Sequence, residues 1–227
     1  MPGAPTPRRS VLYMPGANER AMEKAKSLDC DSIIFDLEDA VAASSKADAR
    51  EKVAAMVKGG GYGFRELIVR VNGLETLWGE DDLAVAATLP VHALLFPKVE
   101  SSAQVEKIIA AVDANGGRHL PIWVMIETPK GVLDVREVAS SSDRVQCLVM
   151  GTSDLVKELR ANHTPSRSNL TLALQQGVLA AREAGIDVLD GVHLDFRNLE
   201  SFREACEQGR AMGFDGKTLI HPTQVDH

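Results

Sequence analysis

Short apolar runs alternate along this 227-residue chain with longer segments in which apolar residues recur at helical spacing. About eight of the runs predict strands, at residues 11–14, 32–35, 67–71, 93–96, 122–126, 146–150, 185–189 with 191–194, and 218–220. The segments between them predict helices at residues 18–28, 44–57, 81–88, 102–114, 129–140, 168–184 and 199–212. This alternation indicates a parallel sheet, and eight repeats favour a closed (β/α)8 TIM barrel of the α/β class over an open doubly wound sheet. We expect one domain over residues 10–227, after a disordered lead-in at residues 1–9.

One stretch, residues 121–130, shows where chemistry could be placed. It reads P-I-W-V-M-I-E-T-P-K, so its apolar run ends at Glu127, and Thr128-Pro129 suits the start of a helix. A buried parallel strand that ends on a carboxylate, directly before a helix, is where α/β enzymes carry reacting groups. A carboxylate that merely solvates the strand end is an equally open alternative.

The other predicted strands also end in polar residues. They are Asp36, Glu38, Asp39, Arg70, Asn72, Lys98, Asp190, His193, Asp195 and His221, together with the segment G-T-S-D at residues 151–154. Because strand ends meet at one face of a barrel, we expect these side chains to gather there. Many acids with one Arg and one Lys suit a divalent cation and an anionic substrate.

Composition excludes some classes of function. A net charge of −7 argues against a nucleic-acid surface, and no apolar run approaches the roughly 20 residues that span a bilayer. The first ten residues lack the apolar core of a signal peptide, so we expect a cytoplasmic protein. The three cysteines, at positions 30, 147 and 206, are far apart and show no metal-binding spacing.

Glu127 and Asp154 follow adjacent predicted strands, so their carboxylates could converge. Two carboxylates with several water positions are a common way to hold Mg²⁺, the oxygens of the substrate completing the octahedron. Asp154 also precedes an apolar segment at residues 155–159, where it could instead be a helix N-cap. The metal and the structural interpretation both stay open on spacing alone.

Arg70 lies in V-R-V-N, between apolar residues, so its guanidinium is expected at the mouth of the barrel. Its fork suits a planar carboxylate or a carbonyl oxygen beside a metal. A salt bridge to Asp36 or Glu38 is an alternative that does not exclude contact with a substrate. The acids of D-L-E-D are too close to remain ionised without partners, so one or two of them, such as Glu38 and Asp39, are expected to orient the basic groups.

Other basic and imidazole side chains allow two interpretations each. Lys24, Lys46 and Arg50 on the first two predicted helices could bind the phosphates of a nucleotide-like cofactor or could be solvated charges. His193 and His221 are candidates for acid–base work by residue type. Two arginines, at positions 160 and 167, could bind an anion or be structural.

Nine motifs together resemble a known family. They are L-Y-M-P-G-A-N at residues 12–18, F-D-L-E-D-A-V at 35–41, K-x-x-A-R at 46–50, V-R-V-N at 69–72, F-P-K at 96–98, I-E-T-P-x-G at 126–131, G-T-S-D-L at 151–155, D-F at 195–196 and G-F-D-G-K-T-L-I-H-P-x-Q at 213–224. Their order and spacing resemble the citrate lyase β-subunit-like branch of the HpcH/HpaI aldolase family, which includes malyl-CoA and citramalyl-CoA lyases.

The resemblance implies a TIM-barrel enzyme, usually a homotrimer or hexamer, that cleaves or forms a C–C bond in a 3-hydroxyacyl-CoA such as malyl-, citramalyl- or citryl-CoA. It implies Mg²⁺ at Glu127 and Asp154, and a substrate carboxylate or keto acid at Arg70 and the adjoining Gly151, Thr152 and Ser153. Coenzyme A would lie near Lys24, Tyr13 and Pro15. Glu38 and Asp39 would support the site as acids. No nucleic-acid or membrane partner is expected.

Alternatives remain within the same resemblance. They are a thioesterase for malyl-CoA or a similar ester, an aldolase for free 2-keto acids without CoA, and a subunit that acts only within a larger lyase complex. Malyl-CoA lyase-type members continue past residue 227 into a segment that carries an acidic catalytic residue into a neighbouring subunit. We expect that segment to be missing here, and we therefore assign no residue of this chain as the general base.

Overall fold

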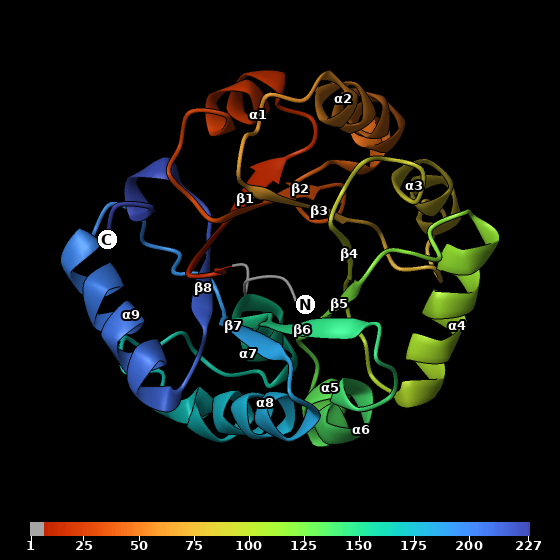
Figure 1. Cartoon of the computed structure of the whole chain (residues 1–227). Coiled ribbons are helices and arrows are strands. Elements are labelled where there is room, and N and C mark those ends of the chain that lie inside the picture. The colour runs from red at the N-terminus through yellow and green to blue at the C-terminus, as the bar shows by residue number, and fades with distance from the viewer. Residues whose placement is uncertain (1–6) are drawn as a thin grey trace, which may run out of the picture.

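The eight expected strands form a closed parallel barrel in chain order, with β8 paired to β1 (Figure 1). The computed structural model describes residues 7–227. The strands are β1 Ser10–Pro15, β2 Ser32–Asp36, β3 Glu66–Arg70, β4 Ala93–Phe96, β5 Ile122–Ile126, β6 Val145–Met150, β7 Asp187–Asp190 and β8 Gly216–Leu219. The predicted (β/α)8 architecture is confirmed. Only the second half of the seventh predicted strand, residues 191–194, is wrong, since those residues follow β7 as a loop.

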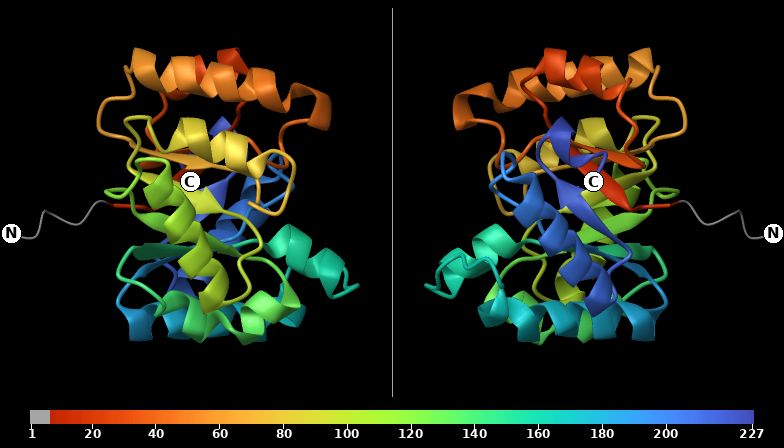
Figure 2. Two further views of the ribbon diagram at one scale, coloured as in Figure 1. Left: turned by 90° about the vertical axis from the view of Figure 1, so that its right-hand side faces the viewer. Right: turned by 90° about the vertical axis from the view of Figure 1, so that its left-hand side faces the viewer.

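A ring of helices covers the outside of the barrel (Figures 1 and 2). They are α1 Glu19–Ala25, α2 Lys46–Gly59, α3 Gly79–Ala86, α4 Ser102–Ala114, α5 Pro129–Leu133, α6 Val135–Ala139, α8 Thr171–Ala184 and α9 Leu199–Met212. Helix α7, Thr152–Glu158, lies inside this ring in Figure 1 and projects from one end of the barrel in Figure 2. Residues 7–227 also contain three 3₁₀ turns: η1 Ala43–Ser45 precedes α2, η2 Ser168–Leu170 precedes α8, and η3 Pro222–Gln224 follows β8. The helix predicted at residues 129–140 is divided at Asp134, which ends α5 and precedes α6. No helix among the described residues is long and apolar enough to cross a membrane.

The strands are buried on both faces, which explains their nearly continuous apolar sequences. Inward-facing residues such as Val11, Ile34, Ile68, Trp123 and Val149 fill the barrel interior. The residues that alternate with them face the helices and form the larger, outer part of the core. Alternate residues of a strand point to opposite faces, so a single register decides which side chains reach the central cavity.

Two arginines anchor the N-terminal end of the described chain. Arg8 pairs with Glu66 and Asp187 at 2.7 Å each, and its guanidinium lies 4.8 Å from the ring centroid of Trp123. Arg9 pairs with Asp31 at 2.7 Å. The expected lead-in is therefore wrong for these two residues, because they are tied to the barrel. Its residues 1–6 lie outside the described part of the chain.

Arg8→Met should lower the free energy of unfolding by about 3 kcal/mol, because it leaves the buried Glu66 carboxylate without its cation. Urea unfolding followed by circular dichroism measures this change. Arg136→Met is the matched control: its partner Glu183 lies at the surface, so the urea midpoint should not move. Equal effects of the two substitutions would contradict a stabilising role for Arg8.

Candidate active site at the carboxyl end of the barrel

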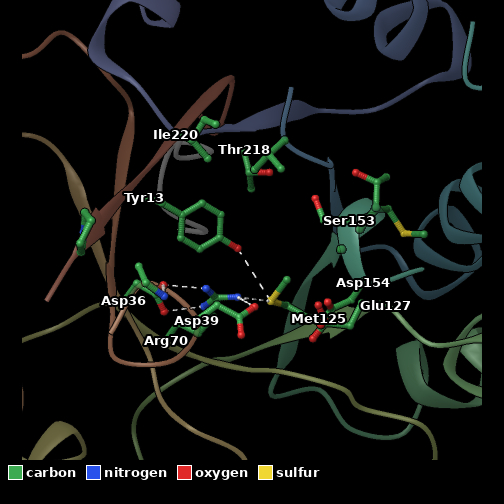
Figure 3. A pocket seen from close by; sticks show the side chains of 16 residues that line it. Tyr13, Asp36, Asp39, Arg70, Met125, Glu127, Ser153, Asp154, Thr218 and Ile220 are labelled. Carbon is green, nitrogen blue, oxygen red and sulfur yellow. Dashed lines mark hydrogen bonds and ion pairs between the residues drawn. The ribbon is translucent and has the colours of Figure 1, made fainter. Parts of the chain in front are cut away.

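A cavity of about 350 Å³ opens at the carboxyl ends of the strands (Figure 3). Its lining comes from the ends of seven of the eight strands and the loops after them, with β4 as the exception, and includes Tyr13, Asp39, Arg70, Met125, Glu127 and residues 150–154. Residues far apart in the sequence thus meet at one point. Most of the expected site residues line this cavity: Tyr13, Pro15, Asp39, Arg70, Glu127, Gly151, Thr152, Ser153 and Asp154.

Glu127 directly follows β5, and its carboxylate lines the cavity. Its side chain is buried, and Oε1 accepts a hydrogen bond of 2.9 Å from the backbone N–H of Lys98. Burial, with the nearby Glu38 carboxylate, raises the pKa of Glu127 to about 7. Gly151 allows this packing, because a β-carbon there would lie 2.5 Å from Glu127 Oε2. The carboxylate therefore occupies a place where its negative charge is poorly compensated.

Asp154 lies beside Glu127 in the first turn of α7 (Figure 3). The N-cap of α7 is Gly151, so the alternative that Asp154 caps this helix is wrong. Its Oδ2 is 3.3 Å from the ammonium of Lys98. The carboxylate is partly exposed and faces the cavity, where a ligand can reach it.

The donor set suits a hard divalent cation. Glu38, Glu127 and Asp154 lie around the ammonium of Lys98. Burial alone would lower the pKa of Lys98, but the negative charge of these three carboxylates raises it above its ordinary value. Residues 7–227 contain no group of three or more His, Cys, Asp or Glu side chains arranged as a complete metal site. Two carboxylates and open positions for water and substrate oxygens are how proteins usually hold Mg²⁺. Glu127 and Asp154 therefore fit Mg²⁺, with ligands still to come from elsewhere.

Arg70 lies on the β2–β3 side of the cavity, across from Glu127 and Asp154 and in contact with Glu38 (Figure 3). Its Nε and Nη2 donate to Asp36 at 2.7 Å each, and Nη1 is 2.9 Å from Glu38. Although burial opposes ionisation, Arg70 holds the pKa of Asp36 below its usual range. The salt bridge that the sequence left as an alternative is confirmed, and Arg70 lines the cavity as well. Asp39 is only loosely paired, with Oδ2 3.9 Å from Arg70 Nη1.

Two donors converge on a weak acceptor in this cavity. Arg70 Nη1 lies 3.4 Å from Met125 Sδ, and the Tyr13 hydroxyl donates to the same sulfur at 3.8 Å (Figure 3). The Tyr13 ring also packs on the guanidinium, 4.9 Å from its centroid. A thioether is a poor acceptor compared with a carboxylate. An anionic ligand would therefore be a better acceptor than the sulfur for the Tyr13 hydroxyl and for Arg70 Nη1, which is also paired with Glu38 at 2.9 Å.

Lys46 and Arg50 have a different role from either interpretation of the sequence. Lys46 Nζ is buried and donates to the carbonyls of Leu37 and Glu38 and to Asn72 Oδ1, at 2.6–2.8 Å. Arg50 pairs with the buried Asp82 at 2.8 Å. They are neither solvated nor available to a phosphate. The buried ammonium fixes the backbone of the loop that carries Glu38 and Asp39. In the sequence, the K-x-x-A-R motif is the one signal that could have pointed to this structural role.

Other candidates lie outside the cavity. Lys24 is exposed in the last turn of α1 and, unlike Tyr13 and Pro15, does not line the cavity, so its contact with coenzyme A stays a prediction. His193 is directed to Ser201 at 3.0 Å, and His221 stacks on Phe196 with centroids 4.4 Å apart. Neither histidine lines the cavity. Of the two loop arginines, the one at position 167 pairs with Asp190 at 2.7 Å, which is the structural alternative.

Fold and site together define a TIM-barrel protein whose acidic cavity lies at the carboxyl end of the strands. Comparison with known proteins gives the family. The model of the HpcH/HpaI aldolase/citrate lyase family matches residues 9–222. The chain belongs to this family, as its motifs indicated.

Individual relatives differ in their named activities. A (3S)-malyl-CoA thioesterase of Cereibacter sphaeroides (strain KD131) is 48% identical over 220 residues, which cover 97% of this chain and 75% of the relative. The citrate lyase subunit beta of Escherichia coli (strain K12) is 34% identical, over 96% of this chain and 74% of the relative.

Solved structures share the fold. Protein CitE from Mycobacterium tuberculosis, in complex with magnesium, acetoacetate and coenzyme A, superposes with a TM-score of 0.82 at 26% identity, over 97% of this chain and 79% of that one. The complex of the same protein with magnesium and acetate gives a TM-score of 0.84 at 27% identity, over 97% and 88%. The named ligands belong to those proteins.

The raised pKa of Glu127 predicts that metal-free protein loses stability as the pH rises. The folded protein holds a proton on Glu127 that the unfolded chain releases above its ordinary pKa near 4.5, so the free energy of unfolding falls between about pH 5 and pH 8. The loss is at most about 3 kcal/mol. Urea unfolding in EDTA across this range measures it, and Glu127→Gln should flatten the profile. Identical slopes for both proteins would exclude Glu127 as the source.

Tyr13→Phe removes one of the two donors that converge on Met125 and keeps the ring over Arg70. The affinity for a small carboxylate such as glyoxylate should fall about 10-fold to 100-fold, since one hydrogen bond to a charged group contributes about 1.5–3 kcal/mol, while the melting temperature stays unchanged. Isothermal titration calorimetry measures the affinity. Tyr62→Phe is the control, because that hydroxyl donates to the carbonyl of Met22 outside the cavity. Equal affinities in Tyr13→Phe and wild type would exclude Tyr13 from the binding site.

Proposed function

We propose that the protein is a Mg²⁺-dependent enzyme acting on the coenzyme A thioester of a short hydroxy acid such as malate. The observation that carries this proposal is the juxtaposition of Glu127 and Asp154 with the donors of Arg70 and Tyr13 around one cavity. A carboxylate next to a hydroxyl group offers oxygens to a cation on one side and to a guanidinium on the other. Malyl-CoA ends in such a group.

Glu127 and Asp154 would hold the metal, since they are the adjacent carboxylates that line the cavity. Mg²⁺ bound there would act as a Lewis acid that stabilises negative charge on substrate oxygens. Arg70 binds the carboxylate end of the substrate and is kept in place by Asp36, whose two oxygens take two of its donors. Because Arg70 is buried and paired before the substrate arrives, little reorganisation is needed during the reaction.

Asp39 is the carboxylate best suited to accept a proton. It lines the cavity and is mostly exposed, with only a long contact to Arg70. Asp36 is engaged by Arg70, Glu127 by the Lys98 backbone, and Asp154 by the Lys98 ammonium. Asp39 is thus free to take the proton of a water molecule or of the substrate hydroxyl. Its carboxylate lies on a loop whose backbone Lys46 fixes at Glu38.

Two reactions of the same thioester are candidates. In hydrolysis, water attacks the thioester carbonyl and the C–S bond breaks, which releases malate and free coenzyme A. In C–C cleavage, a base takes the 3-hydroxyl proton, the C2–C3 bond breaks to release glyoxylate, and the electron pair stays on the acetyl-CoA enolate, which then takes up a proton at C2 to give acetyl-CoA. The 48% identical relative named (3S)-malyl-CoA thioesterase favours hydrolysis. The 34% identical citrate lyase subunit beta favours the carbon–carbon lyase. Assembly as a homotrimer or hexamer and a cytoplasmic location remain predictions.

The products from malyl-CoA and citramalyl-CoA, with and without Mg²⁺, decide between the two reactions. Free thiol without keto acid indicates hydrolysis, whereas keto acid without free thiol indicates C–C cleavage. Turnover without CoA, on free hydroxy acids alone, would instead support the 2-keto acid aldolase. Inactivity on both thioesters would contradict the proposal.

Glu127→Gln should reduce kcat on the active thioester at least about 100-fold, because the amide cannot supply the negative charge that holds the cation. Its Oε1 can still accept from the Lys98 N–H, so circular dichroism should show an intact fold. Glu137→Gln on the outer helix α6 is the control and should keep wild-type turnover. Normal turnover in folded Glu127→Gln would refute the assignment of Glu127.

A further inference from the structure

Lys98 contacts all three carboxylates at the acidic side of the cavity. Its Nζ lies 3.3 Å from Asp154 Oδ2 and 3.6 Å from Glu38 Oε1. Its backbone N–H donates to Glu127 Oε1 at 2.9 Å. Of the ion pairs within residues 7–227, the pair with Lys98 is the one that reaches Asp154. One residue therefore links Glu127, Asp154 and Glu38, which come from three separate segments of the chain.

The backbone of Lys98 adopts an uncommon conformation to do this. Its φ of 50° lies in the left-handed region, which side chains with a β-carbon seldom enter. The conformation is held on both sides: the N–H donates to Glu127, and the carbonyl accepts from Gln104 Nε2 at 3.3 Å. Such backbone outliers cluster at functional sites, where the surrounding structure maintains them. The backbone conformation of Lys98 is thus held in part by Glu127, one of the carboxylates that Lys98 contacts.

The position of the ammonium has a consequence for a divalent cation. Mg²⁺ at Glu127 and Asp154 needs an oxygen of Asp154, the same carboxylate that the ammonium contacts. Two positive charges a few ångströms apart repel each other, so both cations cannot share that carboxylate without a free-energy cost. The Lys98 side chain is 43% exposed, so it can move toward solvent or toward Glu38.

We propose that Lys98 is the internal counter-ion of this site: its ammonium keeps Asp154 and Glu38 together in the metal-free protein and is displaced from Asp154 when Mg²⁺ binds. This inference rests on the proposed function, because it assumes that Glu127 and Asp154 hold the metal. Lys98 is a positioning residue in this scheme. It lowers the affinity for the metal and in exchange preserves the arrangement of the empty site.

The test measures Mg²⁺ binding directly. MgCl₂ is titrated calorimetrically into the EDTA-treated and dialysed full chain, as wild type, Lys98→Gln, Lys98→Arg and Lys130→Gln. Lys98→Gln should bind Mg²⁺ about fivefold more tightly, the size expected for the loss of two partly exposed ion pairs. It should also melt at a lower temperature in EDTA and gain more from added Mg²⁺. Lys98→Arg, which keeps the charge, should stay near wild type.

Lys130→Gln is the matched control. Lys130 is an exposed lysine whose ion pair is a loose one with Glu100 at 3.9 Å, not with Glu38, Glu127 or Asp154, so its loss should change neither measurement. If Lys98→Gln does not fold, Lys98→Asn replaces it, because Asn tolerates a positive φ. Unchanged or weaker Mg²⁺ binding in the uncharged variant would overturn the inference alone. No Mg²⁺ binding to wild type would overturn the proposed function together with it.

Discussion

The buried ion pair between Arg70 and Asp36 is the interaction on which the rest of the site depends. The parallel register of β2 and β3 places the two residues side by side at the last position of each strand. Two hydrogen bonds of 2.7 Å then fix the plane of the guanidinium. A charge as buried as this one is tolerated only with a partner, so the pair and the register support each other. Tyr13, Glu38 and Asp39 are all arranged around that guanidinium.

The side of the cavity next to Glu127 and Asp154 has an excess of negative charge, to which Glu38, paired with both Arg70 and Lys98, also contributes. Glu127, Asp154 and Glu38 are close enough that burial and mutual repulsion raise the pKa of Glu127 to about 7. A site built for stability alone would not retain such a group, since a buried carboxylate without a full partner costs free energy. Lys98 offsets part of this charge. The imbalance that remains is the physical reason for assigning a divalent cation to this side.

Between the two sides, close packing defines what can enter. Gly151 permits the approach of Glu127, and the sulfur of Met125 occupies the position where Arg70 and Tyr13 direct their donors. A buried lysine, Lys46, holds the loop after β2 by its carbonyl oxygens and thereby positions Glu38. The cavity is consequently formed by groups that are held before any ligand binds, as electrostatic preorganisation requires.

The sequence by itself determined the eight strands, most of the helical segments between them and the identity of the residues at the strand ends. Apolar periodicity is a local property that the sequence shows directly. In a parallel barrel the carboxyl ends of all strands lie at the same face. Glu127, Asp154 and Arg70 were therefore predicted at the same mouth, and the nine motifs indicated the family. Lys46, by contrast, is interpreted from the sequence as either a phosphate ligand or a solvated helix-face charge, because nothing local shows that its ammonium is buried among carbonyls.

Only the tertiary structure decided how these groups pair. Closure of the barrel brings Lys98 to Asp154, and the direction of each side chain turns His193 and His221 away from the cavity. It also shows Asp154 inside the first turn of α7, with Gly151 as the N-cap. Contacts of this kind join residues from separate repeats, and their distances depend on strand register and loop conformation. A sequence pattern can identify the residues of such a site, but the packing of the whole barrel determines which charged groups lie next to each of them.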